Sequence, residues 1–163
     1  MKNLIKQGGR GLAIVGAAAG LLAALPIQAE DSSVKRKLDS VGQKYEVDKD
    51  GDFKLTFSFT EDKRTQIVFI HGTTDEIGGL TVRNVFAPVA MVDKDNIAGQ
   101  ALDLLKANNG YKAGAFEIEG NYVLFSMKVP ESATGAQLKR AAELVSILAD
   151  EKEKELSGTR DTF

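Results

Sequence analysis

The sequence predicts an α+β fold in which helices pack on one face of a five-stranded, mostly antiparallel sheet. Between Phe53 and Phe59, apolar residues alternate with polar ones, and a period of two is typical of a strand with one buried face. Between Leu138 and Ala149, apolar residues recur every three or four positions, which is typical of a helix with one buried stripe. Such segments follow each other without a linker, so we expect a single domain with the order α-β-β-β-α-β-β-α.

The first half of the chain predicts one helix and three strands. Val34 and Leu38 begin an apolar stripe at helical spacing, which predicts a helix from about Ser33 to Lys44. The segment TQIVFIH is apolar on both faces, as expected of a central strand, and the glycine-rich loop GTTDEIGG follows it. The three strands are predicted at 53–59, 65–71 and 80–90.

The second half predicts two helices that flank a hairpin. One helix follows the acidic segment DKD and ends near Asn109, and the hairpin strands are predicted at 113–119 and 121–129. Thr134 is the expected cap of a long last helix, and the EKEKE segment near its end is expected to be solvated. The helices are expected to help bury a core of Phe53, Phe57, Phe59, Phe69, Phe116, Phe125, Leu102, Leu105, Leu138, Val145 and Leu148.

The first 29 residues have the three parts of a secretory signal peptide. Three basic residues form a positive start, and an uncharged apolar run then extends from Gly11 to Leu25. The run is shorter than the roughly 20 residues that a membrane-spanning helix needs. We therefore expect a signal peptide at 1–29, cleavage after Ala29, export to the periplasm and a mature domain at 30–163. The alternative is an uncleaved N-terminal anchor.

Charge and cysteine content limit the function classes. The signal segment holds three of the 21 basic residues and none of the 23 acidic ones, which leaves residues 30–163 with a net charge of −5. A negative domain is a poor match for phosphate backbones or anionic lipid, so we expect no nucleic-acid partner and no stable membrane anchor. The chain has no cysteine, so neither a disulfide nor a lipid-modified cysteine is available.

No cluster of catalytic residues is evident in the sequence. His71 is the only histidine, and no GxSxG nucleophile motif occurs. The DKDGD segment resembles part of a calcium loop, but Phe57 stands where an EF-hand has its bidentate Glu, so a turn is the better interpretation. The loop from Gly72 to Gly79 lacks the spacing of a phosphate-binding motif, and Glu117 and Glu119 fit the wet face of a strand. We therefore expect a non-enzymatic protein without a cofactor or metal.

One face of the predicted sheet is more apolar than a surface that meets only water. Apolar side chains interspersed with charged ones suit a protein partner. The alternative is that these are ordinary surface residues and that the assumed strand registers are shifted by one. The expected partner-binding residues are Val68, Ile70, Arg83, Val85, Tyr122 and Leu124.

Several segments resemble the YbjN-like family, which is described as a family of bacterial sensory transduction regulators. They include YEVDKDGDF at 45–53, QIVFI at 66–70, VRNVFAPVA at 82–90 and GAFEIEGNYVLFSMKVP at 114–130. The resemblance covers nearly all of the mature chain and implies a fold shared with class I type III secretion chaperones. Those chaperones are small acidic dimers that hold extended client segments. They work in the cytoplasm, whereas this chain carries an export signal, and the family offers no catalytic motif.

Together these observations predict a non-enzymatic periplasmic module, regulatory or chaperone-like, that binds protein partners through its sheet face and forms a homodimer. The alternative is a small-ligand sensor with a pocket between the sheet and the helices, near the loop from Gly72 to Gly79. A third hypothesis, an enzyme centred on His71, has the least support in the residue pattern.

Overall fold

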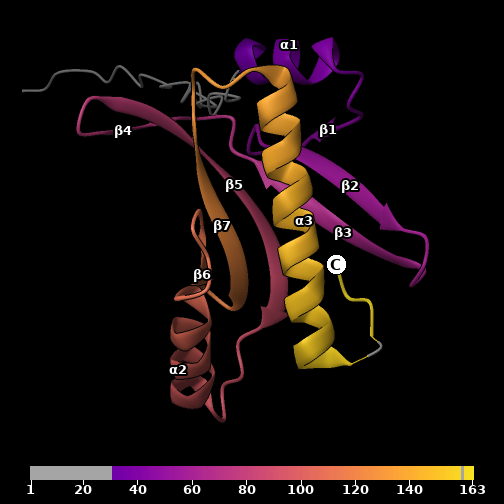
Figure 1. Ribbon diagram of the computed structural model, residues 1–163, viewed down its shortest axis with the longest axis vertical. Coiled ribbons are helices and arrows are strands. Elements are labelled where there is room, and N and C mark those ends of the chain that lie inside the picture. Colours follow the sequence, from indigo (N-terminus) through magenta and orange to yellow (C-terminus); the bar gives the residue numbers. More distant parts are fainter. Residues whose placement is uncertain (1–30, 159) are drawn as a thin grey trace, which may run out of the picture.

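The computed structural model describes residues 31–158 and 160–163, so the predicted signal peptide and its cleavage site lie outside the described residues. The chain folds as one α+β domain around an antiparallel sheet, as the sequence predicts (Figure 1). In chain order, the elements are α1 (Ser32–Ser40), β1 (Glu46–Val47), β2 (Phe53–Phe59), β3 (Arg64–Ile70), β4 (Asp75–Ile77), β5 (Leu80–Met91), α2 (Ile97–Asn108), β6 (Ala115–Glu119), β7 (Tyr122–Pro130) and α3 (Gly135–Ser157).

The sheet has the order β1-β2-β3-β5-β7-β6, and β4 pairs with one end of β5. The described residues therefore form seven strands, and the prediction of five was wrong. The two additional strands, β1 and β4, have only two and three residues, which is too short for an alternating pattern to reveal them. Gly78 and Gly79 have positive φ angles of 57° and 83°, so the predicted glycine-rich loop turns back as a tight hairpin.

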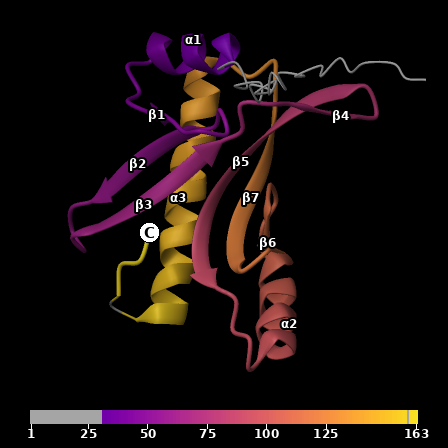
Figure 2. The same cartoon turned by 180° about the vertical axis from the view of Figure 1, so that it is seen from behind.

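The helices lie on one face of the sheet. α3 runs across β3, β5 and β7, α1 packs against α3, and α2 lies against β6 (Figures 1 and 2). α3 begins with a capping box, in which the Gln137 N–H donates to Thr134 Oγ1 (3.3 Å) and the Thr134 N–H donates to Gln137 Oε1 (2.9 Å). Among the described helices, none combines the length and the hydropathy needed to cross a membrane. We call the other sheet face, which no described helix covers, the open face.

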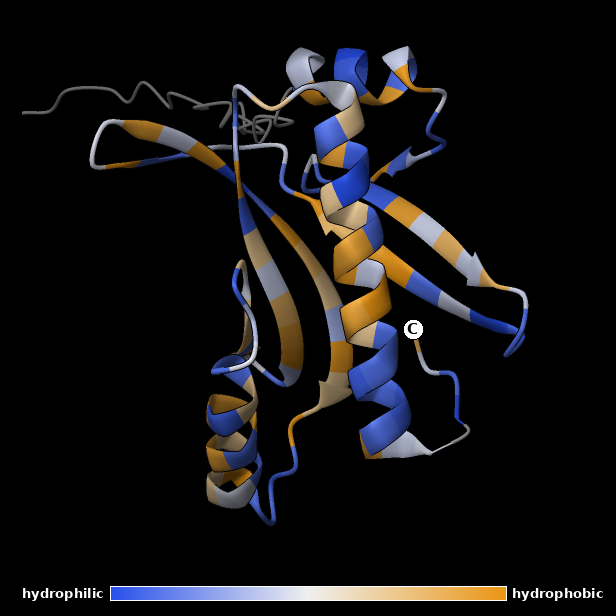
Figure 3. Ribbon diagram, in the orientation of Figure 1, coloured by the Kyte–Doolittle hydropathy of each residue, from blue (hydrophilic) through white to orange (hydrophobic). Residues whose placement is uncertain are grey.

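The core lies between the helices and the sheet and takes alternate residues from β2, β3, β5 and β7. This alternation of apolar and polar residues is visible along β2, whereas the last turns of α3 are hydrophilic (Figure 3). Of the predicted core residues, five are buried as expected: Phe53, Phe116, Phe125, Leu138 and Val145. Three more are only partly buried: Phe57, Phe59 and Leu148.

The remaining residues predicted in the core lie elsewhere. Leu102 and Leu105 are 51% and 68% exposed, because α2 packs mainly against the edge strand β6 and buries Leu104 instead. Phe69 is on the open face, where it lies opposite Phe86 of β5. A helix that covers only one edge strand buries a narrower stripe than the sequence pattern indicates.

Candidate functional site on the open face of the sheet

A groove of about 660 Å³ lies on the open face. β3, β5 and β7 supply its floor, since strand pairing places Phe69 opposite Phe86 and Pro88 opposite Leu124. The residues between them on each strand point to the other face, into the core. The apolar lining of the groove consists of Ile67, Phe69, Phe86, Pro88, Tyr122, Leu124 and Phe163.

Three rings define one part of the groove. Phe69 and Phe86 stack with their ring centroids 5.3 Å apart and an interplanar angle of 19°, and the His71 ring meets Phe86 edge-on at 4.9 Å. Aromatic pairs of such geometry contribute roughly 0.5–1.5 kcal/mol beyond the burial of their surface. All three side chains are only partly buried, so the cluster presents an ordered apolar surface to solvent.

Polar groups stand at both ends of the groove. At one end, Asp52 Oδ1 accepts a hydrogen bond from the backbone N–H of Gly72 (2.8 Å), and Asp52 Oδ2 lies 3.8 Å from His71 Nε2. At the other end, Glu119, the last residue of β6, and Asn121, in the β6–β7 turn, line the groove. Within residues 31–158 and 160–163, no three His, Asp or Glu side chains are grouped to hold a metal ion. The arrangement therefore offers an apolar binding surface bounded by polar groups.

The structure places three of the predicted partner-binding residues in the core. Val68, Ile70 and Val85 have no exposed surface and lie on the helix-covered face, so their predicted position on the open face was wrong. A shift of one residue in register moves every side chain of a strand to the opposite face. The segment TQIVFIH is apolar on both faces, so its pattern could not decide which set of side chains faces the helices.

Arg83 was also expected on the open face, but its side chain is buried and makes two ion pairs. Its Nη2 lies 2.6 Å from Asp31 Oδ2 and 2.8 Å from Glu131 Oε2, so it joins the start of α1 to the end of β7. Burial alone would raise the pKa of Glu131, but hydrogen bonds from Lys37, Ser33 and Arg83 outweigh it and lower the pKa to about 2. Arg83 is thus a structural residue here.

Tyr122 and Leu124 line the groove, on the face where the sequence placed them. Tyr122 is 45% exposed and Leu124 is buried, so the first forms part of the rim and the second part of the floor. Sequence reasoning missed the other apolar residues of the groove. Four of them lie on strands, and the strand alternation would have identified them once the register was known: Ile67, Phe69, Phe86 and Pro88. No pattern in the sequence pointed to the fifth, Phe163.

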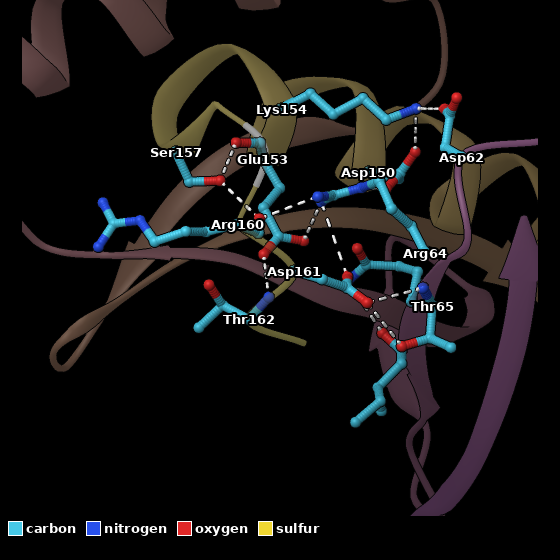
Figure 4. Close-up of polar contacts among 12 residues, drawn as sticks. Asp62, Arg64, Thr65, Asp150, Glu153, Lys154, Ser157, Arg160, Asp161 and Thr162 are labelled. Carbon is cyan, nitrogen blue, oxygen red and sulfur yellow. Dashed lines mark hydrogen bonds and ion pairs between the residues drawn. The ribbon is translucent and has the colours of Figure 1, made fainter.

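A buried ionic cluster joins β3 to α3 (Figure 4). Arg64 Nε lies 2.6 Å from Asp150 Oδ1, and Arg64 Nη2 lies 3.1 Å from Glu153 Oε2. Glu153 belongs to the EKEKE segment that was expected to be solvated, yet it is fully buried, so that expectation was wrong at this position. Burial raises the pKa of the Glu153 carboxyl, although it accepts a hydrogen bond from the Thr162 N–H (2.7 Å).

A second pocket, of about 500 Å³, lies between the end of β5, α2 and the last turns of α3. Met91, Leu104 and Leu156 belong to its lining. It lies between sheet and helices, as the small-ligand alternative requires, but no residue from Gly72 to Gly79 lines it. The structure therefore separates that loop from the pocket with which the sequence analysis associated it.

The comparisons with known proteins found a similarity in fold and none in sequence family. No family model matches the chain, and no curated protein matches it. Among solved structures, the chain is similar to the crystal structure of YbjN from E. coli, with 13% sequence identity and a TM-score of 0.44, over 76% of this chain and 90% of that chain.

Proposed function

We propose that this protein is a non-enzymatic periplasmic module, chaperone-like or regulatory, that binds an extended segment of a protein partner in the groove on the open face. The groove itself carries the proposal: aromatic and aliphatic side chains from three strands line about 660 Å³ on a face that no described helix covers. Contiguous apolar surface of this kind is typical of interaction sites in soluble proteins. The signal-peptide pattern of residues 1–29 supports the periplasmic location.

The arrangement of the groove favours an extended segment. Its apolar floor crosses β3, β5 and β7 between polar ends at Asp52 and Asn121. In an extended chain, alternate side chains point to the same side, so two apolar residues of a partner can lie on the Phe69–Phe86 pair and on Pro88. The polar ends can then accept or donate hydrogen bonds to the partner backbone, which leaves fewer of its polar groups unpaired.

The volume of the groove favours a second candidate function. About 660 Å³ lies within the range of roughly 300–1,000 Å³ that is typical of small-molecule sites. A small apolar ligand would occupy the floor beside Phe86 and Leu124 alone, whereas a protein segment would also cover the rim at Tyr122. This difference makes the rim residue the better place for a discriminating substitution.

Fluorescence anisotropy tests the proposal with labelled, reduced and carboxymethylated α-lactalbumin, a permanently unfolded probe. We expect residues 30–163 to bind this probe, and Ile67→Asp and Tyr122→Asp to weaken binding at least tenfold, because a charge in the groove must lose its water when the partner covers it. Leu144→Asp is the matched control, since Leu144 is an exposed apolar residue of α3, 38% exposed, on the other side of the sheet.

The outcomes separate the two candidates. Unchanged binding in both groove variants, or an equal loss in Leu144→Asp, would contradict the protein-binding proposal, provided that circular dichroism shows each variant to be folded. A thermal-shift screen of small apolar molecules would then test the second candidate, because a ligand that binds only the folded state raises the unfolding midpoint.

The homodimer expected from the sequence stays a prediction. We propose the open face as its interface, because contact between two copies there would bury the apolar groove. In that case sedimentation velocity will show a dimer for the wild type and for Leu144→Asp, and a monomer for Tyr122→Asp. A dimer that persists in Tyr122→Asp would place the interface on another surface.

A further inference from the structure

The chain returns to the sheet after α3. Residues 160–163, which we call the tail, lie beside β3 (Figure 1). The carbonyl oxygen of Arg160 accepts a hydrogen bond from Arg64 Nη1 (2.9 Å), and Asp161 Oδ2 accepts one from the backbone N–H of Thr65 (3.1 Å). The tail is therefore bound through both its backbone and a carboxylate.

The tail lies at an opening between β3 and β5. These strands pair at two positions, Phe69 with Phe86 and Ile70 with Val85, and they separate beyond them (Figure 2). The Thr65 N–H, at the far end of β3, is thus free to donate to the tail instead of to β5. An exposed strand edge of this kind offers backbone groups to an additional extended segment.

Phe163 brings the tail into the groove. Its ring centroid lies 6.4 Å from that of Tyr122, with an interplanar angle of 69°, and it lines the groove together with Pro88 and Leu124. Phe163 also lines the second pocket, beside Met91, so it stands in the opening between the strands. The tail therefore places a carboxylate on the edge of β3 and, two residues later, an aromatic ring in the groove.

The buried carboxylate of Glu153 provides a third contact. Its Oε1 accepts the Thr162 N–H at 2.7 Å, which lies between the Asp161 and Phe163 contacts in the chain. Glu153 makes this contact with a backbone N–H, which any residue except proline can donate. The three contacts together thus recognise an extended backbone with a carboxylate and a ring at fixed positions.

We propose that the tail is an internal ligand of the groove, and that the partner segment has the same chemistry: an extended stretch with a carboxylate two residues before an aromatic side chain. This inference rests on the proposed function and specifies its partner. The partner carboxylate would replace Asp161 on the Thr65 N–H, and the partner ring would replace Phe163. Because the tail is part of the same chain, it competes at a high effective concentration, and a partner must displace it.

The test uses residues 30–163 and a fluorescein-labelled peptide with the sequence LSGTRDTF, which copies residues 156–163. The wild type is expected to bind this peptide weakly, because its own tail occupies the site. The double variant Asp161→Ala/Phe163→Ala is expected to bind it at least tenfold more tightly. A peptide with alanine at both positions, LSGTRATA, is expected to bind neither protein.

Two controls keep the result interpretable. Thermal unfolding establishes that the double variant is folded, and the single variant Phe163→Ala replaces it if it is not. Arg160→Ala is the matched tail variant, because Arg160 contacts β3 through its backbone carbonyl, and it should bind the peptide as weakly as the wild type.

Equal affinity of the peptide for the wild type and the double variant, or equal binding of the alanine peptide, would overturn the inference. If unfolded α-lactalbumin binds both proteins equally and Ile67→Asp abolishes that binding, the groove still binds protein and only the internal-ligand inference fails. If neither the peptide nor α-lactalbumin binds any of these proteins, the proposed function fails as well.

Discussion

Arg64 and Asp150 form a buried ion pair, with 2.6 Å between Nε and Oδ1, that joins the first residue of β3 to the second half of α3. Both side chains are almost completely shielded from water. The same guanidinium also contacts Glu153 and the carbonyl oxygen of Arg160. One buried cation therefore holds together β3, which forms part of the floor of the groove, the long helix α3 and the tail.

Arg64→Met is expected to lower the free energy of unfolding by about 3–5 kcal/mol, because buried Glu153 then loses its cationic partner and buried Asp150 keeps only Lys154, at 2.9 Å. Urea denaturation at neutral pH measures the change. The matched control is Arg140→Met, which removes an exposed 3.0 Å pair with Glu143 and should cost less than about 1 kcal/mol. Equal losses in the two variants would show that the buried cluster has no special role in stability.

Glu131 is expected to make stability depend on acidic pH. Its pKa falls from an ordinary value of 4.5 to about 2 in the folded protein, so its contribution is complete above pH 4.5 and disappears as the pH falls towards 2. Such a shift in pKa corresponds to a contribution of about 3 kcal/mol to the free energy of unfolding. Glu131→Gln should therefore be less stable than the wild type at pH 7. The difference between the urea midpoints of the two proteins should become smaller as the pH is lowered from 5 towards 2. A gap that stays constant over this range would contradict the assignment.

Gly135→Ala is expected to disrupt the contact between α1 and α3. A Cβ at this position would lie 2.3 Å from the backbone carbonyl oxygen of Lys37, so the two helices must move apart, at a cost of about 1–3 kcal/mol. Gly110→Ala is the control, because its Cβ would approach nothing closer than the Ala107 carbonyl oxygen at 3.4 Å. Thermal unfolding should show a lower midpoint for Gly135→Ala alone, and similar midpoints would argue against close helix packing.

Periodicity was sufficient to predict most of the secondary structure, because each pattern reflects a local choice of backbone. The predicted strand at 53–59 has the same bounds as β2, and the predicted strand at 65–71 is displaced from β3 by one residue. The short strand β4 was missed, since three residues and a glycine turn carry no measurable period. Local sequence thus determined the elements wherever an element was long enough to repeat its pattern.

The candidate site was less predictable because it depends on distant parts of the chain. Both faces of β3 carry apolar side chains, so the sequence pattern cannot tell which face is turned towards the helices. That choice depends on how β3 packs against α3. Arg83 and Glu153 are charged residues, a type that usually lies on the surface. Ion pairs with residues far away in the sequence make their burial possible. Phe163 reaches the groove only through the return of the tail, which no local pattern predicts.

The most direct test of the central claim is to locate the bound probe on the protein by NMR. Two-dimensional ¹H–¹⁵N spectra of residues 30–163 would be recorded while unlabelled, reduced and carboxymethylated α-lactalbumin is added. We predict that the largest changes in chemical shift occur in the groove, at Ile67, Phe69 and Leu124, and that α2 is unaffected. Changes centred on the exposed side of α2 at Leu102 and Leu105, or no changes at all, would contradict the claim that the open face is the binding surface.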